Sequence, residues 1–123
     1  MRDRKANARA IRAFTLYALL GYPGDAEYRR IIDDQSLIEH PEYSDIIAVA
    51  RMFERLDREG RDYISKAVRA VYMFVPGGIA PKHIAGRVLS HAMNVPADVR
   101  TVYRWLAYAK RVFSEMCELP EDL

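Results

Sequence analysis

The sequence predicts an all-α domain of about six helices that ends in a helix-turn-helix. Three observations favour this fold class. No segment shows the sustained alternation of apolar and polar residues that is typical of a half-buried strand. Apolar residues instead recur every three or four positions along most of the chain. Turns rich in Gly, Pro and acidic residues separate the segments that have this period.

Three of the expected helices lie in the N-terminal half. The first spans about 7–20 and is stopped by the Gly- and Pro-containing turn at 21–24. A short second helix is expected over about 25–33, followed by an acidic loop. Pro41 fits the first turn of a third helix, whose buried face would consist of Ile46, Val49, Ala50, Phe53 and Leu56.

The C-terminal half contains the other three. Arg58-Glu-Gly60 turns the chain into a fourth helix with Ile64, Ala67, Val68, Val71 and Val75 inward. After the break at 76–81, Pro81 begins a fifth helix, which is expected to bury one face, formed by Ile84, Ala85, Val88, Leu89 and Ala92. The chain turns again at 93–97. Asp98 is then a strong N-cap candidate for the last helix, about 98–117.

The last helix has two distinct faces. Its apolar residues recur at spacings of 3, 4, 3, 4 and 3, the pattern of a helix docked on a core: Val99, Val102, Leu106, Ala109, Phe113 and Met116. The opposite face carries Arg100, Thr101, Arg104, Tyr108 and Arg111. Such a helix can read bases in a DNA major groove. Tyr103 and Trp105 flank the apolar stripe and are expected to pack in the core.

The charges are segregated, although the formal net charge is only +2. Residues 1–12 carry a net +4, residues 24–62 a net −5, and the last ten residues a net −4. Residues 63–113 contain eight basic residues and one acidic residue, a net +7. Positive charge therefore accumulates in the half that ends with the arginine-rich helix, which favours a polyanionic partner.

Four short motifs carry a resemblance to a known family. They are Leu56-Asp-Arg-Glu-Gly60, a helix ending at Val71-Tyr72, the pair Ile84-Ala85, and Asp98-Val-Arg-Thr-Val-Tyr-Arg-Trp105. Together they resemble sigma-70 region 4-like domains, and most closely the phage and prophage transcriptional regulators of the RinA/ArpU type. In that group a capping residue, often Ser, stands where Asp98 stands here. The resemblance covers about 54–117 and implies binding to promoter-like duplex DNA, regulation of late or prophage genes, and a contact with RNA polymerase.

One spacing departs from the family pattern. Ile84 precedes Thr101 by 17 residues, whereas the corresponding pair lies about ten residues before this Thr in the compact motif. We therefore expect either a longer fifth helix or an expanded turn. We divide the chain into an N-terminal helical region, 1–53, for dimerisation or partner contact, and a helix-turn-helix unit, 54–123, within the same compact domain.

The predicted function is sequence-specific binding of double-stranded DNA by a phage-type regulator. Arg100, Thr101 and Arg104 are best placed for base edges, and Arg111 for a phosphate. Lys82 would contact the DNA backbone from the start of the fifth helix, and Arg87 and His91 would extend the same surface. The complete set of residues expected to contact DNA is Lys82, Arg87, His91, Arg100, Thr101, Arg104, Tyr108 and Arg111.

Two alternatives stay open. One is a DNA-packaging subunit such as a small terminase component. The other is a helical protein-interaction module that contacts polymerase or a sigma factor, with its basic face merely solvated. The limited DNA surface of one such module favours a homodimer, for which Phe14, Tyr17, Ile31 and Ile32 would supply the contact.

The sequence gives no sign of catalysis, a cofactor or a metal. His40, His83 and His91 lack the spacing of metal ligands, and the chain has no HExxH, CxxC, nucleophile-elbow or phosphate-loop motif. No apolar run approaches the roughly 20 residues of a membrane span. The basic N-terminus does not lead into a signal-peptide core, and the single cysteine, Cys117, suits a reducing compartment. We therefore expect a non-enzymatic cytoplasmic protein.

Overall fold

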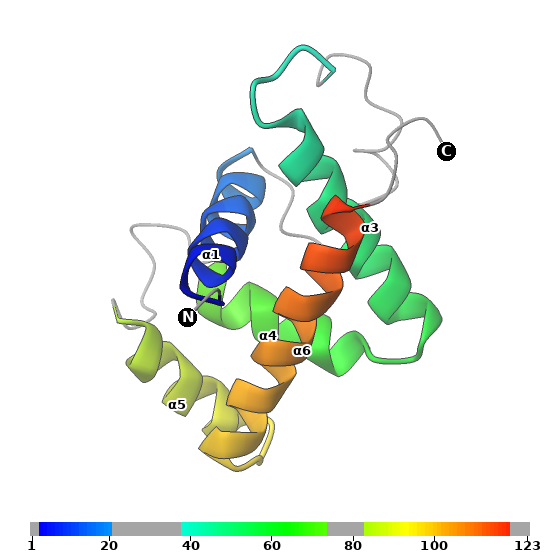
Figure 1. Cartoon of the computed structure of the whole chain (residues 1–123). Helices are drawn as coiled ribbons and strands as arrows, with labels where there is room; N and C mark the ends of the chain where they lie inside the picture. Colours follow the sequence, from blue (N-terminus) through cyan, green and yellow to red (C-terminus); the bar gives the residue numbers. More distant parts are fainter. Residues whose placement is uncertain (1–2, 21–37, 74–82, 119–123) are drawn as a thin grey trace.

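The computed structural model describes residues 3–20, 38–73 and 83–118, which form five α-helices and contain no strand. The helices are α1 (Asp3–Leu19), α3 (Tyr43–Arg58), α4 (Asp62–Tyr72), α5 (Ile84–Asn94) and α6 (Val99–Cys117) (Figure 1). The prediction of an all-α fold is therefore confirmed. The short helix expected over 25–33 lies outside the described residues, as do Ile31, Ile32, Val75, Pro81 and Lys82.

The helix boundaries differ from the sequence-based expectations mainly at the N-terminal ends. Helix α1 begins at Asp3 rather than near Asn7. Helix α3 begins at Tyr43, because Pro41 and Glu42 form a turn before it. The expected turn at Gly60 is confirmed, and Gly60 has a φ of +73°, a left-handed conformation that glycine adopts without steric cost.

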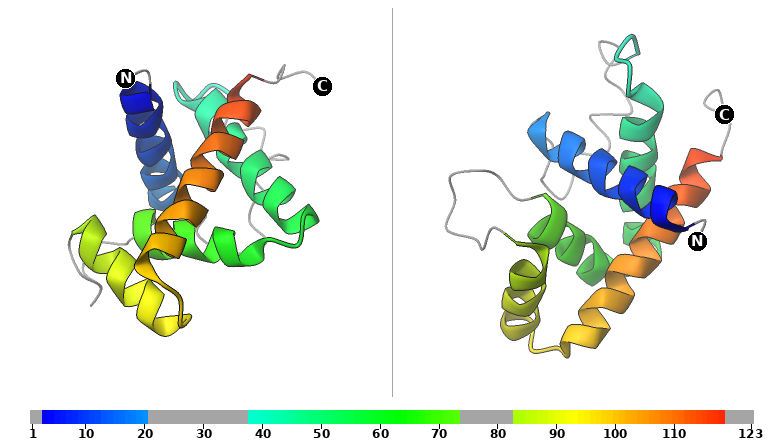
Figure 2. Two further views of the ribbon diagram at one scale, coloured as in Figure 1. Left: turned by 60° about the horizontal axis from the view of Figure 1, so that its bottom comes forward. Right: turned by 60° about the vertical axis from the view of Figure 1, so that its left-hand side comes forward.

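Helix α6 lies at the centre of the fold and contacts each of the other four described helices. It runs between α1 and α3, and its first turns lie beside α5 at one end of the molecule (Figures 1 and 2). The predicted apolar face of α6 is buried through Val102, Leu106, Ala109 and Phe113, and Val112 is buried with them. Full burial of each large apolar side chain contributes about 1.5–3 kcal/mol, so this face holds α6 firmly in place.

Phe14 joins three helices at the centre of the core. Its ring centroid lies 5.7 Å from those of Tyr72 on α4 and Phe113 on α6, the latter in an edge-to-face arrangement. Tyr17 on the same helix lies 5.5 Å from Phe53 on α3. Both Phe14 and Tyr17 are fully buried, so the expectation that they form a dimer contact is wrong. They are inside because α1 packs against α3, α4 and α6.

Helix α5 presents a different face to the core from the one predicted. Val88 and Ala92 are buried as expected, but Ala85 and Leu89 are exposed and His91 is buried. The helix is therefore rotated so that His91, rather than Leu89, faces inward. The apolar period alone did not distinguish these two orientations because the apolar residues of α5 span about 180° of the helix circumference.

The turn between α5 and α6 consists of Val95 to Asp98, four residues, which is the usual length of a helix-turn-helix turn. The amide of Ala97 donates to the carbonyl of Ala92 at 2.8 Å and closes the turn. Ile84 is the first residue of the 11-residue α5. The long spacing from Ile84 to Thr101 therefore comes from the length of α5 and not from an expanded turn.

Arginines of α1 are neutralised by the start of α3. Arg9 donates to the buried carboxylate of Asp45 at 2.6 Å, and Arg12 lies 3.9 Å from Glu42. These pairs fasten α1 to α3. The boundary expected at 53/54 falls inside α3, and one hydrophobic cluster contains residues of all five described helices.

Asp98 caps α6 as predicted: its carboxylate accepts a hydrogen bond from the amide of Arg100 at 3.0 Å. We expect Asp98→Ala to lower the free energy of unfolding by about 1 kcal/mol, because this amide loses its acceptor. Asp98→Asn keeps an acceptor oxygen, so its loss of unfolding free energy should be much smaller than that of Asp98→Ala. Denaturant titration followed by circular dichroism measures both, and equal stability of Asp98→Ala and the unchanged protein would contradict the cap.

Candidate nucleic-acid interface

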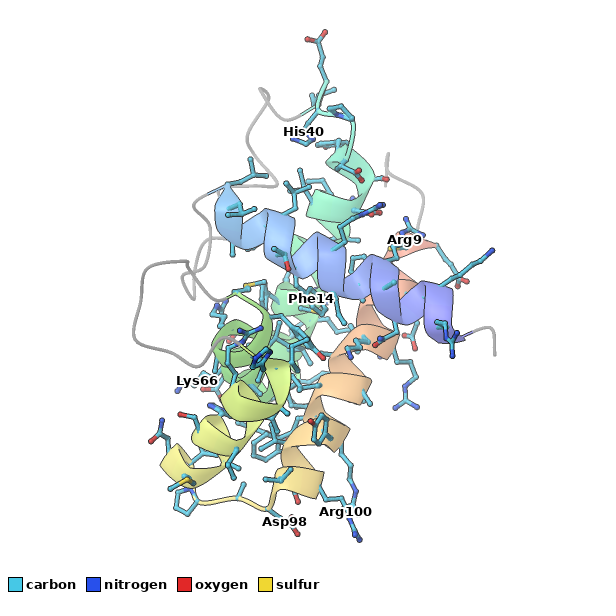
Figure 3. The ribbon with its side chains drawn as sticks, turned by 90° about the vertical axis from the view of Figure 1, so that its left-hand side faces the viewer. Arg9, Phe14, His40, Lys66, Asp98 and Arg100 are labelled. Carbon is cyan, nitrogen blue, oxygen red and sulfur yellow. The ribbon has the colours of Figure 1, made fainter. Side chains whose placement is uncertain are left out.

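The outward face of α6 carries three exposed arginines, Arg100, Arg104 and Arg111. They are exposed because the apolar residues on the opposite side of the helix are buried in the core. Asp98 fixes the start of the helix, and Figure 3 shows Arg100 pointing away from the fold at the end of the molecule opposite His40. The arginines are thus carried by a helix whose orientation the core determines.

These arginines lack acidic partners within the described parts of the chain. The ion pairs there join Arg9, Arg12, Arg55, Arg58, Arg61 and Lys66 to carboxylates, and none of them includes Arg100, Arg104 or Arg111. The face is therefore electropositive at the N-terminal half of α6. A phosphate or the acceptor atoms of a guanine can approach it without displacing a carboxylate.

Tyr108 lies farther along this face and is already engaged. Its hydroxyl donates to the carboxylate of Glu59 at 2.9 Å. The guanidinium carbons of Arg61 and Arg111 lie 4.7 and 5.2 Å from the centroid of its ring. Thr101, the remaining α6 residue of the predicted set, is half-buried. The structure thus keeps Tyr108 close to Arg111, but with its hydroxyl directed to α3.

The two aromatic residues beside the stripe have different surroundings. Trp105 is half-buried and packs against the core, with its ring 5.1 Å from that of Tyr63 in an edge-to-face arrangement. Tyr103 is 45% exposed, so the expectation that it packs in the core is wrong. Tyr103 lies on the same side of α6 as Lys110, whose Nζ atom is 4.9 Å from the centroid of the Tyr72 ring. Burial there lowers the pKa of Lys110.

The residues predicted on α5 do not join this face. Nε of Arg87 donates to the carbonyl of Val71 at 2.6 Å, so its guanidinium is held against the end of α4. His91 is buried, and its Nε2 atom has no hydrogen-bond partner. The expectation that His91 contacts DNA is therefore wrong, because α5 turns this side chain inward. Lys82 lies outside the described residues.

Sequence reasoning missed Arg61 and Tyr63, which reach α6 from the start of α4. Both are exposed, and both contact aromatic residues of α6. The only available signal was the turn at Gly60, which indicated that the chain reverses there but not which helix it meets.

The described residues contain no group of three or more His, Cys, Asp or Glu side chains arranged to hold a metal ion. Burial raises the pKa of the Cys117 thiol to about 11, so this thiol is protonated at neutral pH and is a poor nucleophile. None of the described helices combines the length and the apolar character that crossing a bilayer requires.

No protein-family model, curated protein or solved structure matches this chain. The resemblance to RinA/ArpU-type regulators therefore stays a prediction from short motifs. The interface is defined by the geometry of α6 and its neighbours.

His91 should make the stability of the protein depend on pH. Burial lowers its pKa from the ordinary value of about 6.5, so the folded state keeps the imidazole neutral while the unfolded chain binds a proton. The free energy of unfolding should therefore fall as the pH falls through about 6.5 and below. Thermal unfolding between about pH 7.5 and about pH 5.5 measures this loss of stability. His91→Gln should make the loss smaller. His83→Gln changes an exposed histidine and should leave the loss as it is in the unchanged protein. Identical pH profiles for His91→Gln and the unchanged protein would contradict the assignment.

Proposed function

We propose that the protein binds double-stranded DNA sequence-specifically, with the first turns of α6 in the major groove, as a phage-type transcriptional regulator. The observation that carries this proposal is the two-sided character of α6. One face is buried, and Arg100 and Arg104 on the other face are exposed without a carboxylate partner among the described residues. The regulatory role is supported by the motif resemblance alone.

The spacing of the arginines supports different roles along α6: base contacts near its start and a phosphate contact farther along. Arg100 and Arg104 are one turn apart, about 6 Å along the axis, so they can reach neighbouring base pairs. An arginine donates to O6 and N7 of guanine, and each such pair adds about 1–3 kcal/mol of discrimination. Arg111 lies about 17 Å from Arg100 along the axis, where the groove wall brings a phosphate rather than a base edge.

A second candidate function is a helical protein-interaction module. It is favoured by the exposure of Leu89, Met93 and Val95, of which Met93 is 73% exposed. Exposed apolar side chains that lie together often mark a contact with another protein. In this case the arginines of α6 would only be solvated.

The dependence of duplex binding on salt separates the two functions. A DNA-binding protein loses affinity linearly in log salt, with a slope of about −0.9 for each phosphate it neutralises. Fluorescence anisotropy with a labelled random duplex measures this slope. The KCl concentration is varied from about 50 to about 300 mM, which brackets physiological ionic strength. Negligible binding at about 0.15 M salt would reject the proposal and leave the interaction module. Selection of bound sequences from random duplexes then identifies the operator, and a palindrome would indicate a dimer.

Arg104→Ala should weaken binding to the selected operator about 5- to 150-fold, as expected when a base contact worth about 1–3 kcal/mol is lost. It should also relax the preference at one base pair without changing the melting temperature, because the side chain is exposed. Arg111→Ala is the matched control on the same face and should weaken binding equally on all sequences. An equal loss on all sequences for Arg104→Ala would make Arg104 a phosphate contact instead.

A further inference from the structure

Arg61 lies beside the outward face of α6 although it belongs to the turn between α3 and α4. The turn is held by two backbone hydrogen bonds, from Gly60 to the carbonyl of Asp57 at 3.0 Å and from Arg61 to the carbonyl of Leu56 at 2.8 Å. This is the Schellman pattern, which needs a residue with positive φ such as Gly60. The backbone of Arg61 is therefore fixed, and its guanidinium lies over Tyr108.

Two guanidinium groups, one from this turn and one from α6, lie over this ring. Arg61 and Arg111 both have their guanidinium carbons within 5.2 Å of the Tyr108 centroid. Both groups carry a positive charge, so an anion beside them lowers the electrostatic cost of placing them around one ring. Within the described residues that anion is Glu59.

Glu59 holds three partners with its two oxygens. One oxygen accepts from Nε of Arg55 at 3.1 Å. The other accepts from the Tyr108 hydroxyl at 2.9 Å and lies 3.3 Å from Nε of Arg61. The hydrogen bonds from Arg55, and next from Tyr108, lower the pKa of Glu59, so the carboxylate is charged at neutral pH.

Arg61 is the partner that Glu59 releases most easily. Its distance to the carboxylate is the longest of the three, and 44% of its side chain is exposed. Arg55, in contrast, is held by both Glu59 and Glu115. If Arg61 leaves, Glu59 still keeps Arg55 and Tyr108. The guanidinium groups of Arg55, Arg61 and Arg111 then share the carboxylates of Glu59 and Glu115, and Arg61 is left without the carboxylate that it pairs with.

We propose that a backbone phosphate of duplex DNA supplies this anion. Arg61 moves from Glu59 to the phosphate beside Arg111, and Glu59 stays with Arg55 and Tyr108. The DNA-binding surface thus extends from α6 to the start of α4, and Glu59 competes with DNA and limits the affinity. This inference rests on the proposed DNA binding by α6.

Arg61→Ala tests the contact. It should weaken binding about fivefold at 0.15 M salt, which is the counterion-release contribution of one phosphate, and it should reduce the salt slope by about 0.9 on every duplex sequence. Arg58→Ala is the matched control, since it removes the same charge from an exposed arginine three residues away that pairs with Glu54. Arg58→Ala should leave the salt slope unchanged.

Glu59→Gln tests the competition from the opposite direction. The amide keeps an acceptor oxygen for Tyr108 but removes the negative charge beside the phosphate, so binding should tighten on the order of threefold. Glu54→Gln changes the net charge equally at a site that pairs with Arg58, and it should have a smaller effect. Circular dichroism melting of each variant shows that it is folded.

The outcomes separate this inference from the proposed function. If the unchanged protein binds duplex DNA with a salt slope, and Arg61→Ala and Glu59→Gln behave as their controls do, the phosphate contact at Arg61 is rejected while DNA binding by α6 stands. If the unchanged protein does not bind duplex DNA at all, both are rejected. Weaker DNA binding by Arg61→Ala together with tighter DNA binding by Glu59→Gln supports both the phosphate contact and DNA binding by α6.

Discussion

The burial of one face of α6 is the constraint on which the rest of the structure depends. Phe113 on this face meets Phe14 from α1, and Phe14 in turn meets Tyr72 from α4. Because α6 contacts every other described helix, its rotation about its own axis is determined by the core. The positions of Arg100, Arg104 and Arg111 follow from that rotation, since a helix with one buried face must present the opposite face to solvent.

Carboxylates neutralise several of the arginines outside α6. Acidic residues at the start of α3 neutralise arginines of α1, and Glu59 near its end holds Arg55 and Arg61. Arg100 and Arg104 take part in none of the ion pairs among the described residues, although the Asp98 carboxylate caps the backbone amide of Arg100. Charge segregation in the sequence thus becomes a local electropositive surface. Glu59 lies at the border of that surface, where its carboxylate pairs with Arg61 and accepts a hydrogen bond from Tyr108.

In helix α5 the burial of some side chains is the reverse of what their polarity predicts. The helix places His91 in the core and leaves Leu89 and Met93 exposed. A buried imidazole nitrogen without a hydrogen-bond partner, such as Nε2 of His91, costs free energy. An exposed leucine forgoes the gain from burial. The hydrogen bond from Arg87 to the end of α4 helps to hold this orientation. The exposed side of α5 is therefore partly apolar, with Leu89 and Met93 accessible to solvent.

The sequence by itself determined the helical class, the N-cap at Asp98, the turn at Gly60 and the two faces of α6. These features depend on local spacing and on the backbone preferences of single residues, which can be seen without knowing the fold. The tertiary structure decided which way α5 faces, that Phe14 and Tyr17 are core residues, and that Arg61 and Glu59 from α3 and the following turn meet Tyr108 on α6. Those contacts join residues far apart in the chain, such as Glu59 and Tyr108, 49 positions apart. Periodicity within one helix carries no information about such pairs, because they depend on how whole helices are packed against one another.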